Sequence, residues 1–454
     1  MFGGLTDDIP SSYTALPNGP TYLMMLAEGE RRLAADVRRL LHEELGSSIP
    51  VANMNGGTLP MAFVAANDAY DYDDKHRYVD HPSFVEEGWR LPATPGSGNR
   101  NFVSGNHVGS IYSVRMIDRP FTISEDNLCT PWRNAAASGF AIGAIAALQG
   151  TAATYRFSWA NLENYGTPER QTPGSYFNVT ANPLMAASER LAIALFPRGD
   201  LGAYAKRYVY TVDPAFMAST NAANADTPMT YFPFGWAAWR ARVGFVSSTE
   251  VPAGAIDAGA WPGMMRKLRP EICTDLGIDR PSGTETLPDG STVNVDFDAG
   301  SLAVATPRTA AGYAESGTVV AGPLTAKLNG TASTVWVSSL DGCPLSRSVR
   351  MLFGHLTEAQ AEGRTFADPG FSTLLRWGGP QNLMRAGRAD VALALGGGRF
   401  KVYALAADGT RRFRVPCTAT GGVLRFTADV AADPALATCQ YEIVRGGGIK
   451  VIVR

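Results

Sequence analysis

The order of strand-like and helix-like segments in residues 20–200 limits the possible folds of this chain more than any other feature. Apolar residues recur at helical spacing over residues 20–46, which predicts an amphipathic helix that ends at Gly46. Beyond it, the sequence predicts strands at 49–55, 69–73, 120–124 and 153–159, and helices at 58–67, 134–149 and 182–196. Strands that alternate with helices at this spacing indicate βα units and a parallel sheet.

The pattern changes after about residue 203. Residues 204–290 contain strand fragments, loops and several aromatic residues, which predicts a β-rich connecting segment. From residue 291 to 454, short runs of alternating apolar and polar residues recur between turn residues, as is typical of an antiparallel β-sandwich. We therefore expect an α/β part over residues 1–203, a connecting segment over 204–290 and an all-β part over 291–454.

Charge and apolar length exclude several kinds of partner. The chain has 40 Lys and Arg against 42 Asp and Glu, so its net charge of −2 gives no reason to expect nucleic acid or an acidic membrane surface as partner. The longest apolar stretch, Ala135 to Leu148, is shorter than the ~20 residues that a membrane span needs, so it predicts a buried helix. The start, from Met1 to Gly4, does not have the pattern of a signal peptide.

The usual cofactor and metal motifs are also missing from the sequence. No glycine-rich nucleotide loop follows a predicted strand, and neither HExxH nor GxSxG occurs, so we expect no cofactor and no metal. The five cysteines lack the spacing of a zinc site. Cys417 and Cys439 lie in adjacent predicted strands, so they either form a disulfide or belong to a set of five free thiols.

Polar and aromatic residues gather where the predicted strands end. They are Asn53 and Asn55, His76 and Tyr78, Glu125 to Asn127, and Trp159. In (β/α) barrels the functional residues come from the carboxyl ends of the strands. The pattern therefore predicts a site formed by several consecutive strand ends.

Glu125 is the sharpest candidate among them, because it ends a buried strand, with Asn127 two residues further on. Glycoside hydrolysis needs two carboxyl groups beside the sugar, and in retaining enzymes one is the nucleophile. The structural alternative is that Glu125 caps the next helix or pairs with Arg133.

The segment from Asp71 to Pro82 and the lone Trp159 are less specific. The segment concentrates acids, histidines and tyrosines, and it is interpreted as a wall of a sugar site, as a metal site or as a solvated loop. Trp159 is interpreted either as a core residue or as a platform on which a sugar ring stacks. The sequence leaves these alternatives open.

Taken together, the motifs resemble those of clan A glycoside hydrolases, which are retaining (β/α)8 enzymes, here with an appended β-sandwich. The similarity to large cellulase-like bacterial members covers most of residues 20–200 and continues more weakly into the sandwich. Its motifs are Asp73 to Tyr78 with His81-Pro82, Pro120 to Asn127, Ala147 to Gln149, Phe157 to Trp159, Phe196 to Asp200, Thr306 to Thr309 and Ser338 to Gly342.

The resemblance implies a role for each residue that it matches. The predicted strands correspond to the fifth to eighth of a barrel, and Glu125 matches the catalytic nucleophile. His76 and Tyr78 match residues that line the sugar site and orient the nucleophile, and Trp159 matches the platform under the sugar. Asn53, Asn55 and Asn127 are further expected substrate-binding residues.

The chain departs from the family at the acid/base, which follows the fourth strand and is usually part of an Asn-Glu pair. The residues before the first predicted helix contain Asp7 and Asp8 but no Glu. Three explanations stay open: a fragment of a longer hydrolase, which we favour; a partial barrel completed by a second copy or another polypeptide; and a degenerate relative with a rebuilt edge. For a fragment, localisation cannot be read from Met1, and the resemblance favours export.

The expectation is therefore a partial (β/α)8 barrel followed by a β-sandwich, with retaining hydrolysis of glycosidic bonds if the missing half of the site is supplied. The rival is a non-catalytic carbohydrate-binding or scaffold protein derived from a glycosidase. The expected partner is a carbohydrate, with a homodimer or a second polypeptide as a further partner if the barrel is completed from outside.

Overall fold

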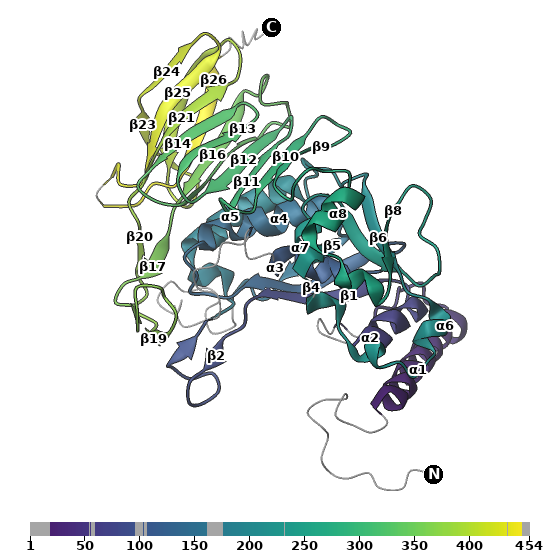
Figure 1. Cartoon of the computed structure of the whole chain (residues 1–454). Coiled ribbons are helices and arrows are strands. Elements are labelled where there is room, and N and C mark those ends of the chain that lie inside the picture. Colours follow the sequence, from purple (N-terminus) through teal and green to yellow (C-terminus); the bar gives the residue numbers. More distant parts are fainter. Residues whose placement is uncertain are drawn as a thin grey trace.

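A computed structural model describes residues 19–53, 55, 60–95, 103, 107–160, 176–230, 232–433 and 435–446. The chain mixes helices and parallel strands in its first part with large antiparallel sheets in its second (Figure 1). The antiparallel sheets lie at one end of the molecule, and helix α1 (Gly19–Arg38) lies at the other. The fold class is thus α/β plus antiparallel β.

The first sheet is parallel, with the strand order β1-β4-β5. Its strands are β1 (Asp73–Val79), β4 (Phe121–Leu128) and β5 (Ala153–Arg156). The strand expected at 49–55 is reduced to a parallel bridge between Ala52 and Tyr72. The strand expected at 69–73 lies further along the chain as β1, because two of its charged residues, Lys75 and Arg77, are buried with ion-pair partners.

Helices α4 (Ser138–Gln149) and α5 (Pro183–Leu195) confirm the predicted helices nearby, and every residue of α4 is buried. A Cβ at Gly139 would lie 2.1 Å from the Ser188 carbonyl oxygen, and one at Gly143 would lie 2.6 Å from the Ala192 Cα. The two glycines therefore allow the backbones of α4 and α5 to approach closely. None of the helices in the described ranges has the length and apolarity to cross a membrane.

The remaining helices of the first part are short, and α1 continues without a break into a π-helix, η2 (Arg39–Glu44). The α-helices are α2 (Met61–Ala66), α3 (His107–Ser110), α6 (Pro214–Met217), α7 (Phe232–Ala237) and α8 (Arg269–Asp275). The 3₁₀ turns are η3 (Asn67–Ala69), η4 (Ile111–Val114), η5 (Ala135–Ala137), η8 (Val179–Ala181), η9 (Ala222–Ala225), η10 (Pro228–Thr230) and η11 (Gly263–Arg266).

The segment 204–290, expected to be a β-rich connection, contains a second parallel sheet with the order β7-β6-β8, together with short helices. Its strands are β6 (Arg207–Thr211), β7 (Arg242–Val246) and β8 (Ile256–Ala260). The buried Arg115 connects this sheet to helix α4 by donating to the Val243 carbonyl of β7 at 3.0 Å and to the Gln149 carbonyl of α4 at 2.7 Å. Burial lowers the pKa of Arg115 to about 9.

The C-terminal half has a nine-stranded and a five-stranded antiparallel sheet, with the orders β23-β22-β26-β16-β15-β12-β11-β10-β9 and β13-β14-β21-β25-β24. The first contains β9 (Gly283–Thr286), β10 (Thr292–Asp296), β11 (Ser301–Ala305), β12 (Thr309–Ala314), β15 (Ser333–Ser339), β16 (Arg350–Leu356), β22 (Arg399–Leu405), β23 (Arg411–Val415) and β26 (Gln440–Gly446). The second contains β13 (Gly317–Ala321), β14 (Leu324–Asn329), β21 (Arg388–Ala394), β24 (Cys417–Thr420) and β25 (Val423–Asp429).

The nine-stranded sheet is buried on both faces where it crosses the first part of the chain. Val335 and Val337 of β15 pack into the core shared with the five-stranded sheet, whereas Trp336 between them packs into the core of the α/β part. Because successive side chains of a strand point to opposite faces, such a strand reads as a continuous apolar run. The sheet thus joins the two halves of the molecule through a common hydrophobic layer.

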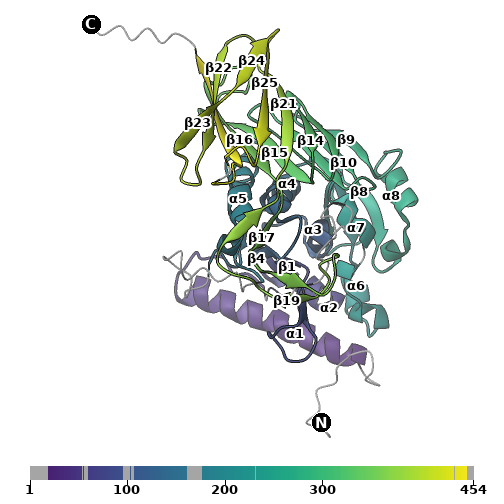
Figure 2. The ribbon, with the colours of Figure 1, turned by 90° about the vertical axis from the view of Figure 1, so that its left-hand side faces the viewer.

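Residues 357–386 leave the sandwich between β16 and β21 and reach the α/β part. This excursion contains β17 (Ala359–Ala361), β18 (Thr365–Phe366), β19 (Leu374–Arg376) and β20 (Asn382–Met384). Strands β18 and β19 extend a hairpin of β2 (Ser83–Phe84) and β3 (Ala93–Thr94) into the sheet β18-β19-β3-β2. In Figures 1 and 2, β17 and β19 lie below the strands of the sandwich.

The five cysteines are all free thiols, which decides between the two interpretations of Cys417 and Cys439. Cys417 packs against the core of the sandwich, whereas Cys439 packs with Leu184 and Ala187 of α5. The two residues belong to different apolar clusters, although they lie in neighbouring segments of the sequence.

Candidate functional site

The side chains of His76, Tyr78 and Glu125 meet where β1 and β4 pair, and Glu125 lies within β4, which continues to Leu128 instead of ending at 124 as expected. The Tyr78 hydroxyl donates to Glu125 Oε2 at 2.5 Å, and His76 Nδ1 lies 3.2 Å from the same oxygen. The register makes His76 and Glu125 direct partners, because β4 contains one extra residue, Ser124, at a bulge opposite Lys75 and His76. The side chains of His76 and Glu125 remain 28% and 29% exposed, so this carboxylate is held in place and open to a ligand.

The contact also changes the titration of the tyrosine. Burial and the hydrogen bond to Glu125 raise the pKa of Tyr78 well above its usual value. The phenol therefore stays protonated at neutral pH and acts as a fixed donor to one oxygen of the carboxylate, Oε2. In the described residues, Tyr78 and His76 are the polar side chains that contact Glu125, and no Lys or Arg pairs with it.

Among the described residues, Glu125 neither caps the next helix nor pairs with Arg133. Arg133 lies 3.9 Å from a Glu358 oxygen and over the ring of Phe371 instead. The next residue, Asp126, faces the opposite side of the sheet, where it forms a buried ion pair with Arg77 at 2.5 Å and accepts from Thr154 at 2.7 Å. Two neighbouring carboxylates on one strand thus have different surroundings.

The three asparagines expected to bind substrate take part in internal contacts. Asn127 donates to the carbonyls of Phe157 and Phe177 and is fully buried. Asn53 is also buried, where its amide donates to Asp73 at 3.1 Å and its oxygen accepts from the Asp74 backbone at 2.8 Å. The backbone carbonyl of Asn55 accepts from the His76 backbone at 3.1 Å. The side chains of Asn127 and Asn53 thus have partners inside the protein, and their role in substrate binding stays a prediction.

Trp159 follows β5 and is 48% exposed. The ring contact with the Glu125 cluster is made instead by Phe157, whose ring lies edge-on to Tyr78 at 6.3 Å between centroids. Phe177 and His81 also contact Tyr78, at 4.8 Å and 6.3 Å. His81 and Phe157 belong to motifs of the family resemblance but were given no role of their own, and Phe177 was not singled out in the sequence.

The acidic residues of the segment from Asp71 to Pro82 are divided between different partners. Asp73 pairs with the buried Lys75 at 3.0 Å and accepts from Asn67 at 3.0 Å. Asp74 accepts from Ser124 at 2.5 Å and from Thr122. In the parts of the chain that the structure describes, no group of three or more His, Cys, Asp or Glu side chains is arranged to hold a metal ion.

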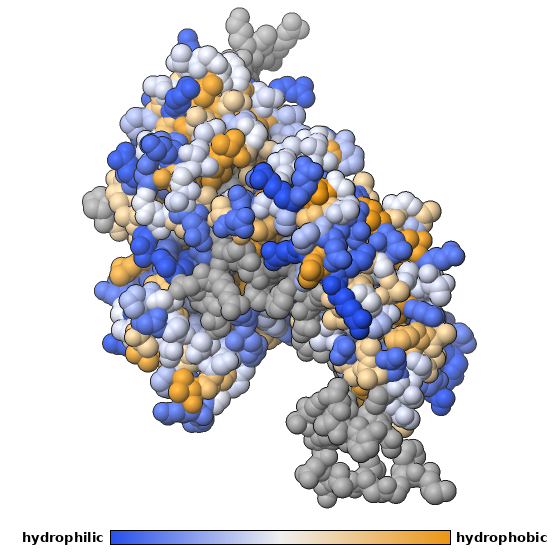
Figure 3. All heavy atoms as spheres, in the orientation of Figure 1, coloured by the Kyte–Doolittle hydropathy of each residue, from blue (hydrophilic) through white to orange (hydrophobic). Residues whose placement is uncertain are grey.

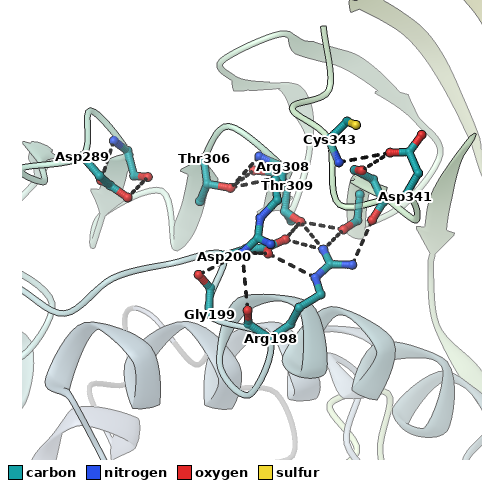
Figure 4. Close-up of polar contacts among 12 residues, drawn as sticks. Arg198, Gly199, Asp200, Asp289, Thr306, Arg308, Thr309, Asp341 and Cys343 are labelled. Carbon is teal, nitrogen blue, oxygen red and sulfur yellow. Dashed lines mark hydrogen bonds and ion pairs between the residues drawn. The ribbon is translucent and has the colours of Figure 1, made fainter. Parts of the chain in front are cut away.

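Three further motifs of the family resemblance meet in a different place, where Figure 4 shows them as one polar cluster. The carboxylate of Asp200 is fully buried and binds Arg198, Arg308 at 2.7 Å and the Thr309 hydroxyl at 2.6 Å. Arg198 also donates to the Ser338 hydroxyl at 2.5 Å. This Asp200 cluster fastens the segment after α5 to β12 and β15, so the motifs around it have a structural role.

Another polar cavity, of about 290 Å³, lies where the α/β part meets the sandwich. Its wall includes Arg133, Glu315, Glu358 and Arg385, and the Glu358 carboxylate pairs with Arg385 at 2.8 Å. The acids and bases of this wall balance one another. Because the charges of its wall are matched by one another, this cavity is a weaker candidate for a ligand site than the Glu125 carboxylate.

On the face of the molecule in Figure 3, the apolar residues occur in small groups separated by hydrophilic ones. Broad apolar patches on a protein surface commonly mark contacts with other proteins or with membranes.

The comparisons with known proteins found no match among family models, curated proteins or solved structures.

Proposed function

We propose that this protein acts on glycosidic bonds as a retaining glycoside hydrolase-like protein, with Glu125 as the nucleophile. The observation that carries the proposal is the Glu125 carboxylate itself, which is partly exposed on the parallel strand β4 and contacted by Tyr78 and His76. In this proposal, Ala52 and strands β1, β4 and β5 correspond to consecutive strands of a (β/α)8 barrel, since they pair in parallel and in sequence order.

The chemistry assigns a separate task to each group. One Glu125 oxygen attacks the anomeric carbon, the bond from that carbon to the leaving oxygen breaks, and a glycosyl ester forms on Glu125. The Tyr78 hydroxyl binds Oε2, which fixes the orientation of the carboxylate for this attack. Water then attacks the same carbon, the ester bond to Glu125 breaks, and the sugar is released with its original configuration.

The acid/base that would protonate the leaving oxygen is not assigned to a described residue. Retaining enzymes place it ~5–5.5 Å from the nucleophile. The neighbouring carboxylates Asp74 and Asp126 are buried and hydrogen-bonded to other side chains. In the proposal the acid/base therefore comes from outside the described residues, either from the rest of the polypeptide or from a partner that completes the barrel.

A substrate with a very good leaving group tests the nucleophile without the acid/base. Dinitrophenyl 2-fluoroglycosides need little protonation, and their fluorine slows hydrolysis of the ester, so the glycosyl-enzyme accumulates. We expect such probes of gluco, manno, galacto or xylo configuration to release dinitrophenolate and to leave one glycosyl group on Glu125, as measured by mass spectrometry of the intact protein and its peptides.

The matched controls are Glu125→Gln, which removes the nucleophile, and Glu86→Gln, which changes an exposed carboxylate of the nearby hairpin. Labelling is expected to disappear in the first variant and to persist in the second. If none of the four probes labels the folded protein, or if Glu125→Gln is labelled as fast as the wild type, the proposed nucleophile is wrong.

The second candidate is a carbohydrate-binding protein without turnover, and the exposed indole of Trp159 favours it because such a face can stack on a sugar ring. In that case Glu125→Gln still binds glycans, Trp159→Ala does not, and no probe forms an adduct. The same labelling experiment, combined with calorimetric titration of the two variants, therefore separates the two candidates.

A further inference from the structure

The hairpin after β1 holds a tryptophan in an unusual conformation. Trp89 lies in the loop between β2 and β3, its φ of 65° falls in the left-handed region, and the residue is 63% exposed. Bulky residues rarely adopt this backbone conformation, and strained residues of this kind are concentrated at functional sites. The strain persists here together with high exposure, so burial of the indole does not account for it.

Ring contacts connect Trp89 to the Glu125 site. The Trp89 ring lies edge-on to His81 with 5.8 Å between centroids, and His81 in turn contacts the Tyr78 ring at 6.3 Å. Since the Tyr78 hydroxyl binds Glu125, two ring contacts separate Trp89 from the residue that holds the carboxylate. Trp89 is thus connected to the proposed site through His81 and Tyr78.

The excursion from the sandwich supports this hairpin from behind. Leu374 of β19 pairs with Ala93 of β3, and the Trp377 ring packs against Tyr176 with 4.7 Å between centroids. Tyr176 contacts both Trp89 and Phe84, so the indole is held within a packed aromatic cluster. A rigid exposed aromatic face loses little conformational entropy when a ligand stacks on it.

We propose that Trp89 forms an outer sugar-binding subsite and that the ligand is an oligosaccharide, one unit of which stacks on Trp89 while another lies at Glu125. This proposal rests on the proposed function, because it extends the Glu125 site. It assigns the C-terminal half a part in that site, since residues 357–386 keep the outer platform in place.

Calorimetric titration with glycans of increasing length tests the proposal. The ligands are cello-, xylo- and manno-oligosaccharides of one to six units, and the protein is the full chain with Glu125→Gln, so that no turnover occurs. We expect affinity to rise with length by about tenfold or more for the preferred series. Adding Trp89→Ala removes this gain and leaves the affinity for the shortest bound ligand unchanged, whereas Trp89→Phe retains part of it.

Val85→Ala is the matched control, because Val85 is an exposed apolar residue of the same hairpin. It is expected to bind like the parent, and an equal thermal midpoint in all variants shows that the fold is intact. Length dependence that persists in Trp89→Ala, or glycan binding without any length dependence, overturns the outer subsite while the Glu125 site stands. Absence of both glycan binding and probe labelling instead overturns the proposed function, and this inference with it.

Discussion

Glu125 of β4 and Asp200, in the segment after α5, are both carboxylates that belong to motifs of the family resemblance, but their surroundings differ. Asp200 is fully buried and meets two arginines and a hydroxyl. Glu125 is partly exposed and meets a phenol and an imidazole. A buried carboxylate whose charge is matched by arginines stabilises a fold, whereas a positioned carboxylate with free lone pairs can react with a ligand.

The contrast separates stability from chemistry in a way that variants can test. Changes at Asp200 should affect unfolding without affecting labelling by the fluoroglycosides. Changes around Glu125 should affect labelling by the fluoroglycosides without affecting unfolding. A variant that moved both quantities together would break this separation.

The largest effect on stability is expected for Asp200→Ala. Removing the buried carboxylate leaves Arg198 and Arg308 without their shared partner, which should lower the free energy of unfolding by about 3 kcal/mol. Urea denaturation measures it, and the rate of labelling of the folded fraction should not change. A loss below about 1 kcal/mol, as for an exposed ion pair, would show that the Asp200 cluster contributes little.

Next in size is the effect of Tyr78→Phe on the labelling rate. The variant keeps the ring contacts with Phe177 and Phe157 but loses the hydrogen bond to Glu125. A hydrogen bond to a charged group contributes about 1.5–3 kcal/mol, so labelling should slow by about tenfold to a hundredfold. A labelling rate equal to that of the wild type would mean that Tyr78 does not position the nucleophile.

A smaller effect concerns pH and extends the same contrast to histidines. His355 is buried in the sandwich, and burial lowers its pKa to about 4, whereas His76 beside Glu125 is partly exposed. The unfolded chain takes up a proton near pH 6.5 and the folded chain does so only near pH 4, so stability is greatest above pH 6.5 and falls between these values.

For this single group, the free energy of unfolding should decrease by about 2 kcal/mol from pH 7 to pH 5. Urea titrations at the two pH values measure the decrease, and His355→Gln should reduce it, because glutamine does not titrate. An equal decrease in the variant and the wild type would assign the acid sensitivity to other groups.

Much of the local structure was readable from residue patterns. The helical spacing over residues 20–46 and the apolar run at 135–148 correspond to α1 and α4, and the alternation after residue 291 corresponds to the antiparallel strands. The placement of β1 was missed, since Lys75 and Arg77 look like surface residues until their partners are known. Asp73 lies two positions before Lys75, but Asp126 lies far from Arg77 in the sequence.

In the candidate site, too, residue patterns predicted only a part. The chemistry of their side chains indicated Glu125, His76 and Tyr78 as candidates, and the structure brings these three together. Residue type alone did not separate them from Asn53 and Asn127, whose side chains are turned to internal partners. Nor did any local pattern indicate Trp89, because its aromatic neighbour Tyr176 is packed by Trp377 from the other half of the chain.

Residue patterns alone therefore predict most of the periodic elements and the set of chemically capable side chains, because periodicity and side-chain chemistry are local properties. Contacts made on folding set which carboxylate is neutralised by arginines, which stays open, and which tryptophan is held at the surface. The physical reason is that burial and ion pairing depend on contacts between distant segments, such as Arg198 with Ser338 and Leu374 with Ala93, which no short-range pattern encodes.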